Sequence, residues 1–458
     1  MTLRKAYNAK AIRELAPKSG RAVRKHLNAD ALIALMREDF QKIPDHRAGN
    51  AKISLDDVLM SGLAVFQLKD PSLLAFDNRR IKEPENLHTI WGITNIPCDS
   101  QMRTDLDPIE LSDLRAPFRS AFRQLQRGKD LEKMTLLGGY YLASGDGTGF
   151  YSSAKVSSPY CLRKTLKNGT EAYYQQMYAV ALVHPDHKEV IPFFPEMITT
   201  QDGADKNDCE RNAARRFYEE FRREHPHLKV IVTEDALSSN APHIHDLLRL
   251  DLRFILGVKP GDHQFLFEWV DKAVEQKQVT EFEYIDPAAP EKYHCFRFIN
   301  QVPLNRSNQD LLVNFLEYWE VDKDGKLTKF SWVTDIAITE ENVFELMRAG
   351  RARWKIENET FNTLKNQGYN LGHNYGLGEK NLSAVFTILM MLAFLLDQIQ
   401  QMSCWLFQAA WKKEESKRSL WEAVRSYFKT WRVDSMETIY RAIAHGTSAC
   451  HLKEVCRT

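Results

Sequence analysis

Hydrophobic residues repeat at helical spacing over the first part of the chain and then change period. From Leu27 to about Glu132 they recur every three or four residues, with Pro and Asn at the breaks, which predicts a helical N-terminal domain over residues 1–132. After Met134 the apolar runs become short and β-rich, and MYAVALVHPDHKEVIPFF predicts a hairpin of two strands. A sheet therefore begins here.

Strands and helices then alternate up to residue 258. Residues 206–224 predict a long helix, LKVIVTEDA a buried strand that ends in acid, HIHDLLRL a short helix and LRFILGV a second buried strand. This alternation is typical of a mixed sheet with helices packed on it. Residues 133–258 are therefore predicted to form the first part of an α/β core.

A third texture begins at Lys259, where the helical period fades until about Phe330. The runs VTEFEYI, YHCFRFI and FLEYWEV are aromatic and β-branched, and they predict a β-rich insertion over residues 259–338. Helical spacing returns at Thr339, where TEEN resembles a helix N-cap followed by acid. We expect the core to resume over residues 339–400 and a helical C-terminal region to occupy residues 401–458.

The amino-acid composition predicts a folded protein that resides in the cytoplasm. The 458 residues are 43% hydrophobic and 27% charged, which is ordinary for a globular protein. Seven scattered cysteines without a CxxC pair suggest neither a disulfide framework nor a zinc ribbon, and favour reduced thiols. The apolar run from Leu382 to Leu396 is shorter than the roughly 20 residues that a membrane span needs, so it predicts a buried helix and no membrane partner.

Charge is balanced overall but uneven along the chain. The net charge is +1, whereas residues 1–50 hold 11 Lys and Arg against 5 Asp and Glu. A second basic stretch near the C-terminus contains Lys412, Lys413, Lys417, Arg418, Arg425, Lys429 and Arg432. Either stretch could supply phosphate contacts to DNA, and either could equally be a solvated helix face.

Three acids are candidates for chemistry. Asp146 in ASGDGTG and Asp235 in IVTEDALSS each end a predicted strand, and strand ends of open sheets are where ligands bind. Glu357 falls on the helix after the insertion, which could pack on the sheet and approach both aspartates. Three carboxylates favour Mg²⁺ or Mn²⁺ over zinc, and two such ions can support in-line phosphoryl displacement.

Arg353 lies four residues before Glu357, so the two share one helix face. Arg353 could orient the carboxylate and contact a phosphate, or the two could form an ordinary surface ion pair. Glu359 is the rival third ligand, but it points away from Arg353. Asp335 in WVTD is a weaker rival that is more typical of a turn or strand end.

Histidines and cysteines give no comparable signal. His243 and His245 are two apart and diverge on a helix, which favours surface or capping roles over metal binding. A C-terminal group matches no zinc spacing and comprises His445, Cys450, His451 and Cys456.

The stretch RWKIENETFNTLK, followed by GYNLGHNYG, resembles the C-terminal signature of DDE insertion-sequence transposases, in the branch described by a Tyr-Arg-Glu-Lys motif. WVTDIAITEENVFELMRAGRARW, the GDGT turn and EDALSSNAP are similar to the same family in order and placement. The resemblance spans about residues 30–400. It implies a ribonuclease H-like mixed-sheet catalytic core that is interrupted by a β-strand insertion before the helix carrying the glutamate.

For the site, the resemblance implies a triad of Asp146, Asp235 and Glu357 that holds two Mg²⁺, with Mn²⁺ as a substitute. Arg353 matches the family arginine and is expected to contact DNA. Two positions depart from the motif: Gly350 stands where tyrosine is expected, and Leu364 stands where lysine is expected. Lys365, one place later, is carried over as DNA-binding, although one extra residue turns it about 100° around a regular helix.

The function implied is a cytoplasmic DNA transposase. It would cleave transposon ends and join the 3′-hydroxyl to target DNA, acting as a homodimer on double-stranded DNA with terminal inverted repeats. The N-terminal helices would bind DNA, dimerise or do both. Some relatives hold a flipped base against a tryptophan of the insertion, where Trp269, Trp319 and Trp332 lie here; core packing is the alternative for each. Two other functions stay open: a domesticated DNA-binding protein without catalysis, and a metal-dependent nuclease of the same fold.

Overall fold

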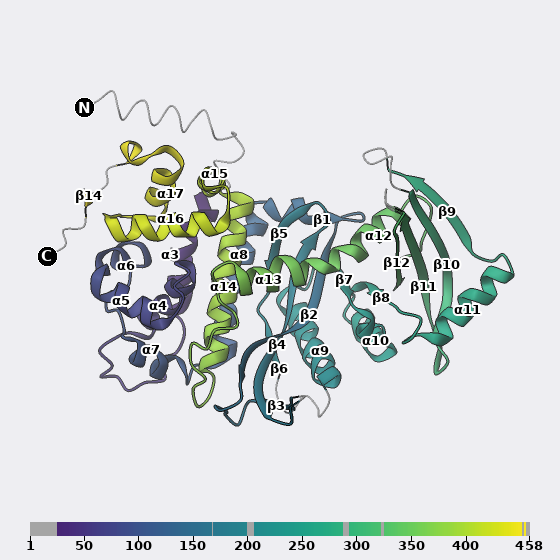
Figure 1. Ribbon diagram of the computed structural model, residues 1–458, viewed down its shortest axis with the longest axis horizontal. Helices are drawn as coiled ribbons and strands as arrows, with labels where there is room; N and C mark the ends of the chain where they lie inside the picture. The colour runs from purple at the N-terminus through teal and green to yellow at the C-terminus, as the bar shows by residue number, and fades with distance from the viewer. Residues whose placement is uncertain are drawn as a thin grey trace.

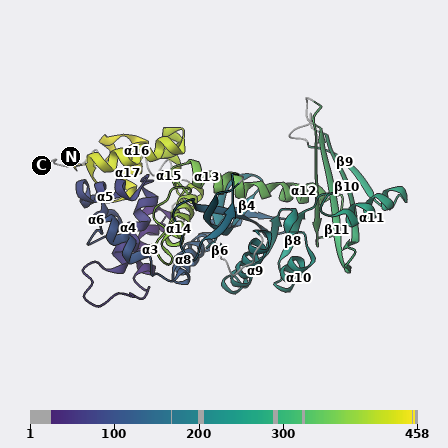
Figure 2. The ribbon, with the colours of Figure 1, turned by 60° about the horizontal axis from the view of Figure 1, so that its bottom comes forward.

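The computed structural model describes residues 25–166, 168–198, 206–286, 293–321, 325–450 and 453–454. The protein is mixed α/β: a helical region, a central sheet and a β extension follow one another along its long axis (Figure 1). The turned view keeps the same order, with the helical region and the extension at opposite ends (Figure 2). Residues 1–24, which hold much of the predicted basic N-terminal stretch, lie outside the described residues.

Helices α3, α4 and α5 of the N-terminal region begin where a polar side chain caps them. Asn28, Ser54 and Ser72 accept hydrogen bonds from backbone N–H groups in the first turns of α3, α4 and α5. The helices of this region are α3 (Ala29–Phe40), α4 (Leu55–Gln67), α5 (Leu73–Lys82), α6 (Pro84–Trp91), α7 (Asp99–Leu106) and α8 (Arg115–Arg127), with short 3₁₀ turns η1 (Leu111–Leu114) and η2 (Asp130–Met134). The predicted helical texture up to residue 132 is confirmed.

The core alternates strands and helices as the sequence predicts. Its strands are β1 (Thr135–Leu136), β2 (Tyr140–Ser153), β3 (Leu162–Thr165), β4 (Glu171–His184), β5 (His187–Pro192), β6 (Glu196–Ile198), β7 (Val230–Glu234) and β8 (Arg253–Gly257). The helices α9 (Lys206–Glu224) and α10 (Ala241–Arg249) lie on one side of this sheet (Figure 2). The expected hairpin is present, because β4 and β5 pair antiparallel across His184 and His187.

The extension is built from β9 (Thr280–Ile285), β10 (Tyr293–Asn305), β11 (Asn308–Val321) and β12 (Leu327–Thr334). These strands continue the core sheet, since β12 pairs antiparallel with β8 and the order across the sheet is β3-β4-β2-β7-β8-β12-β11-β10-β9. Only β2, β7 and β8 run parallel to one another among the paired strands of the described chain.

One prediction for the extension is wrong. The helical period does not fade throughout, because α11 spans Gln264–Glu275 and covers part of β10. QFLFEWVDKAVE places its buried residues Leu266, Val270 and Ala273 at helical spacing. The helical pattern is short, and the strands that follow it are also rich in aromatic residues. The helix was therefore not distinguished from those strands in the sequence.

After the extension the chain returns to the core through α12 (Val343–Arg351), the 3₁₀ turn η5 (Ala352–Trp354), the π-helical turn η6 (Ile356–Phe361) and α13 (Asn362–Asn366). The C-terminal region comprises α14 (Leu382–Ser403), α15 (Trp405–Glu414), α16 (Lys417–Thr430), α17 (Met436–His445), the 3₁₀ turn η7 (Thr447–Ala449) and the short strand pair β13 (Trp431–Arg432) and β14 (Lys453–Glu454). In the described part of the chain, α14 is the one helix long and apolar enough to cross a membrane, but its apolar window is wholly buried within the protein. The predicted buried helix is confirmed.

Two polar anchors tie α14 to the N-terminal helices. Asp107 accepts backbone N–H groups at the start of α14, including that of Leu382 at 2.9 Å. Deeper in the helix, the buried Asp397 pairs with Lys69 at 2.6 Å and accepts the Tyr369 hydroxyl at 2.5 Å. Buried charges are costly unless paired in this way, so these contacts fix how the helical region docks on the core.

Candidate active site

The first acid, Asp235, lies where the sequence predicts it. All five residues of β7 are buried, and the strand ends at Glu234, so Asp235 is the first residue beyond it. Its side chain accepts the backbone N–H of Leu237 at 3.0 Å and caps the following turn η4 (Ala236–Ser238). The predicted strand-end placement of Asp235 is confirmed.

The second acid, Asp146, does not end a strand. It lies in the middle of β2, which continues to Ser153 because β4 pairs with it along most of its length, with Asp146 opposite Ala179. However, the parallel pairing of β2 with β7 stops at Ser144 and Thr233. Two steps further in the same register, Asp146 stands beside Asp235. The aspartates therefore meet where β7 ends, although β2 does not end there.

The third acid, Glu357, was predicted to lie on a helix. The segment that carries it is not one regular helix but passes from α12 through a 3₁₀ turn into a π turn. π turns are frequent at functional sites. Arg353 donates to Glu357 at 2.9 Å, which confirms that the two share a face. The Ser144 hydroxyl, two residues before Asp146, donates to the Arg353 carbonyl at 3.0 Å and joins this segment to β2.

Electrostatics link the three acids. Burial raises the pKa of Asp146 to about 7, and although the Gly147 N–H opposes that rise, the charges of Glu357 and Asp235 add to it. The Arg353 guanidinium lies 4.0 Å from Asp146 and bonds to Glu357, so one cation stands between two of the acids. A crowded set of carboxylates of this kind is stabilised by added positive charge.

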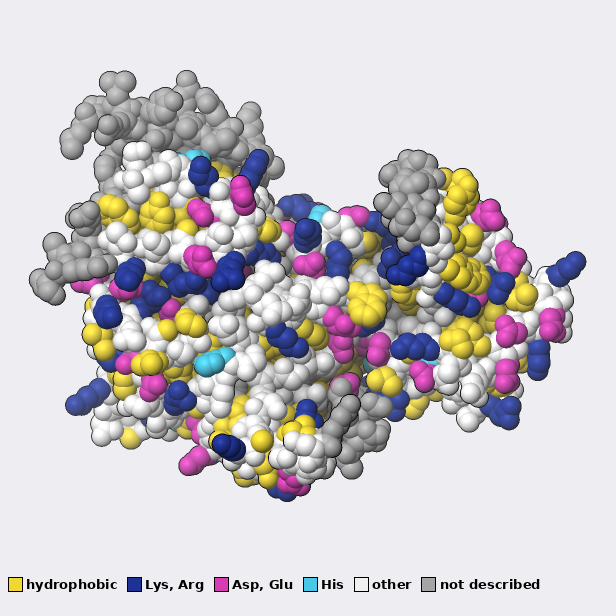
Figure 3. Space-filling model, viewed as in Figure 1, with side chains coloured by type: hydrophobic (Ala, Val, Ile, Leu, Met, Phe, Trp, Pro, Cys, Tyr) yellow, Lys and Arg dark blue, Asp and Glu magenta, His cyan; other side chains and the backbone are white. Residues whose placement is uncertain are grey.

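A cleft of about 630 Å³ opens beside these residues, between the core and the extension. Asp235, Glu357 and Arg353 line it; Asp146 is not a lining residue but neighbours Arg353. Its cationic lining is Lys259, Lys329, Arg351 and Arg353, and its aromatic lining is Phe330, Trp332 and Trp354. Figure 3 shows Asp and Glu side chains gathered where the core meets the extension, with Lys and Arg side chains on the extension beside them.

The carboxylates fit a hard divalent cation by their chemistry but are not arranged as a closed ligand set. Among the residues that the structure describes, no three His, Cys, Asp or Glu side chains are grouped closely enough to hold an ion. The Arg353 guanidinium takes one oxygen of Glu357. For Glu357 to offer both oxygens to an ion, Arg353 would have to give up this bond.

The rival third ligands lie elsewhere. Glu359 faces Lys355 and Lys417. Burial lowers the pKa of each lysine, and the negative charge of Glu359 partly opposes that shift. Asp335 follows β12 and accepts the backbone N–H of Phe254 at 3.0 Å. Since Phe254 is near the start of β8, Asp335 lies at the sheet edge opposite to Asp235, in the strand-end role that the sequence favours.

One departure from the family motif has a structural reason. A Cβ at Gly350 would lie 2.6 Å from indole atoms of Trp332, which lines the cleft. Trp332 thus fills the space beside this helix position, and a tyrosine there would collide with it. Lys365, the other departure, is exposed on α13 and is not among the lining residues, so its DNA-binding role stays a prediction.

The histidine interpretation needs one correction. His243 is not at the surface: it is buried, and its Nε2 bonds to Glu234 at 2.7 Å. The sequence missed this because Glu234 sits beside the more conspicuous Asp235. His245 is exposed, as expected. Of the C-terminal group, Cys450 bonds to the Thr438 carbonyl, and His451 and Cys456 lie outside the described residues.

Of the three tryptophans of the extension, Trp332 reaches the cleft, stacked on Phe330 at 5.7 Å. Trp319 lies between Arg297 and Lys329, while Trp269 is exposed on α11. The sequence did not single out Trp354, which is 47% exposed and stacks under the Arg353 guanidinium at 4.5 Å. Its position directly after Arg353 was the available signal.

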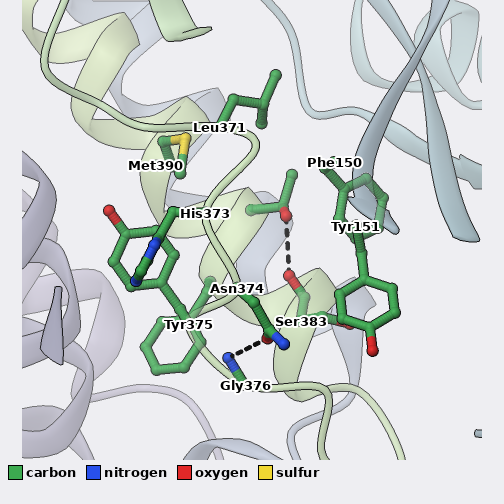
Figure 4. Close-up of a pocket in the computed structure, with 11 residues that line it drawn as sticks. Phe150, Tyr151, Leu371, His373, Asn374, Tyr375, Gly376, Ser383 and Met390 are labelled. Carbon is green, nitrogen blue, oxygen red and sulfur yellow. Dashed lines mark hydrogen bonds between the residues drawn. The ribbon is translucent and has the colours of Figure 1, made fainter. Parts of the chain in front are cut away.

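The GYNLGHNYG segment does not reach the cleft. Leu371, His373 and Tyr375 instead pack over β2 and α14, around a space of about 10 Å³ (Figure 4). That volume holds no more than one water molecule. Tyr375 also meets Phe66 of α4 edge-on at 5.1 Å. This half of the motif is therefore a packing element.

Comparison with known proteins gives little. No family model matches the chain, and no curated protein matches it. The solved structure described as "Cryo-EM structure of piggyBac transposase synaptic complex with hairpin DNA (SNHP)" is similar with a TM-score of 0.39 and 9% sequence identity, over 94% of this chain and 80% of that chain. A likeness of this size assigns neither a fold family nor an activity.

Proposed function

We propose that the protein is a DNA transposase that uses Asp146, Asp235 and Glu357 for phosphoryl transfer. One observation carries the proposal: acids from two strands and a distant helical segment converge around Arg353 beside one cleft. Each acid alone has an ordinary explanation. Their meeting requires the whole core to fold, and the RWKIE stretch that resembles DDE transposases supplies two of the residues.

The chemistry follows from the donor set. Three carboxylates suit two Mg²⁺ or Mn²⁺ ions, which when bound would activate the attacking oxygen and stabilise the leaving one. The charges of Glu357 and Asp235 both act on Asp146, and these three carboxylates together would hold the ions. Arg353, once released from Glu357, is placed to hold a phosphate in bidentate fashion. Hydrolysis at the transposon end and attack by the 3′-hydroxyl on target DNA are the same displacement with different nucleophiles.

The surroundings of the cleft suit DNA. Lys259, Lys329 and Arg351 can contact phosphates, and Trp332 and Trp354 can meet bases. Figure 3 also shows Lys and Arg side chains gathered along and just below α16. In the predicted basic C-terminal stretch, two arginines serve the fold as well, since Arg425 donates to the Leu68 carbonyl and Arg432 pairs with Glu85. We propose that the DNA partner is double-stranded DNA with terminal inverted repeats, and that a homodimer of this protein pairs two such ends.

End cleavage in Mg²⁺ or Mn²⁺ tests the proposal, with DNA from the flanks of the gene as substrate. Asp146→Asn and Asp235→Asn should each abolish cleavage while leaving DNA affinity intact. Asp271→Asn is the matched control, because Asp271 is an exposed acid on α11, away from the cleft. Persistent cleavage by either site variant would contradict the mechanism.

A second assay separates the alternatives. A transposase should join a pre-cleaved 3′ end to plasmid DNA, whereas a nuclease of the same fold would hydrolyse without joining. A domesticated DNA-binding protein would bind the end and do neither.

A further inference from the structure

A carboxylate that faces the protein interior lies directly behind the candidate site. Glu234, the last residue of β7, is 1% exposed and precedes Asp235. One of its oxygens accepts the hydroxyls of Tyr178 and Tyr218, the latter at 2.6 Å, and the other bonds to His243 Nε2 at 2.7 Å. These four side chains, the Glu234 network, come from β7, β4, α9 and α10.

The network is buried, and both oxygens of Glu234 are hydrogen-bonded. Tyr178, Tyr218 and His243 are each less than a tenth exposed. A buried carboxylate costs several kcal/mol unless hydrogen bonds and charge compensate it, and here three donors do so. Losing one donor while the carboxylate stays buried should therefore shift the elements that meet at Glu234.

The network begins where the backbone pairing of β2 and β7 stops. The last paired residues are Ser144 and Thr233, so Asp146 and Asp235 lie beyond the hydrogen bonds that hold these two strands together. In the same register, Gly145 stands beside Glu234. Beyond Ser144 and Thr233, backbone pairing between β2 and β7 no longer sets the spacing of the two aspartates.

Gly145 brings the network into contact with β2 itself. A Cβ at this position would lie 2.8 Å from the Tyr178 ring carbon Cζ and 2.9 Å from Glu234 Oε1, and closer still to the Tyr178 hydroxyl. The missing side chain lets the hydroxyl and the carboxylate press against the backbone one residue before Asp146. The same group of atoms thus borders both aspartates.

We propose that the Glu234 network is a positioning device that sets the separation of Asp146 and Asp235 for the reaction. The inference rests on the proposed function, because it assigns those two aspartates to the site. None of the four side chains needs to touch the DNA. They act by holding the ends of two neighbouring strands.

The experiment uses the full chain and the double variant Tyr178→Phe/Tyr218→Phe, which removes two hydroxyls and leaves both rings in place. We expect kcat for end cleavage to fall by about 10- to 100-fold, the usual effect of removing partners behind a metal ligand, with KM for DNA unchanged. Mn²⁺ affinity, read by electron paramagnetic resonance without DNA, should weaken by a similar factor. Glu234→Gln keeps the shape and can still accept both hydroxyls and donate to His243, so it should retain most of the parent kcat.

Tyr369→Phe is the matched control, since it removes a buried hydroxyl from the buried carboxylate of Asp397, away from the cleft. It should lower the melting temperature but leave kcat and Mn²⁺ affinity at the parent values. The positioning role is overturned if the double variant binds Mn²⁺ and cleaves like the parent, or if Tyr369→Phe lowers kcat as much. A different result would overturn the proposed function itself: cleavage of end DNA by Asp146→Asn.

Discussion

Asp146 lies on β2 and Asp235 directly follows the neighbouring parallel strand β7, whereas Glu357 lies on a helical segment that changes its winding from α to 3₁₀ to π. The strand pair is restrained on several sides: β4 pairs along β2, and the Glu234 network fills the space behind both aspartates. Asp146 also has a largely buried environment, which raises its pKa.

Glu357 is held more loosely. Its side chain is 38% exposed, against 29% for Asp146, and accepts a hydrogen bond from Arg353, a residue of the same segment. That segment is joined to β2 through the Ser144 hydroxyl and the Arg353 carbonyl. The comparison indicates a site with a fixed half and an adjustable half. Closing around metal and DNA would then move Glu357 and Arg353 and leave the aspartates in place.

The largest expected effect comes from changing side-chain length in each half. Asp146→Glu should abolish end cleavage, because an extra methylene has no room beside a fixed strand pair. Glu357→Asp should keep measurable cleavage, lowered by about 10²-fold, since the loosely held segment can follow a shorter side chain at the cost of a misplacement near 1 Å. Single-turnover cleavage measures both. The reverse order of activities would contradict the division into a fixed and an adjustable half.

The same division explains what the sequence could reveal. Asp235 was predictable, because a strand of five buried residues followed by an acid has one simple interpretation. Asp146 was found as a candidate but placed wrongly at a strand end. Its glycine-flanked position imitates a turn, while the strand continues because β4 pairs with it at Ala179, and the local sequence of β2 does not reveal that pairing.

The helical half was less predictable for a physical reason. Spacing arguments assume 100° per residue. They hold from Arg353 to Glu357 but not through the rest of the π turn, which begins at Ile356 and ends at Phe361. The angle assigned to Lys365 from its distance to Glu357 therefore has no firm basis. The partner of Gly350, Trp332, is also invisible from the sequence, because it comes from the extension and meets the helix only in the folded protein.

A smaller effect should separate two glycines, one in each half. Gly145→Ala forces a Cβ against the buried Tyr178 and Glu234, and should lower the free energy of unfolding by about 1–3 kcal/mol and reduce cleavage. Gly350→Ala would place a Cβ 2.6 Å from the indole of Trp332, which is also buried but lines the cleft. Because alanine gains about 1 kcal/mol of helix propensity there, the net loss of stability should be smaller than for Gly145→Ala.

Urea unfolding measures this pair, with single-turnover cleavage alongside. The urea midpoints should fall in the order parent, Gly350→Ala, Gly145→Ala. If Gly350→Ala proved the more damaging, the helical half would be the rigid one.

The smallest expected effect concerns two lysines near the adjustable half. Lys329 lines the cleft with its Nζ 2.5 Å from Glu317, whereas Lys365 is exposed on α13 outside the lining. If the path of DNA follows the cleft, Lys329→Ala should make the plot of log affinity against log salt less steep by about the amount that one phosphate contact contributes. Lys365→Ala should change this slope by less. Neither change should alter kcat, because neither amine reaches the acids. Binding titrations of end DNA at several salt concentrations measure both slopes. If Lys365→Ala reduced the slope as much as Lys329→Ala, the DNA would pass across α13. That result would support the role carried over from the Tyr-Arg-Glu-Lys motif.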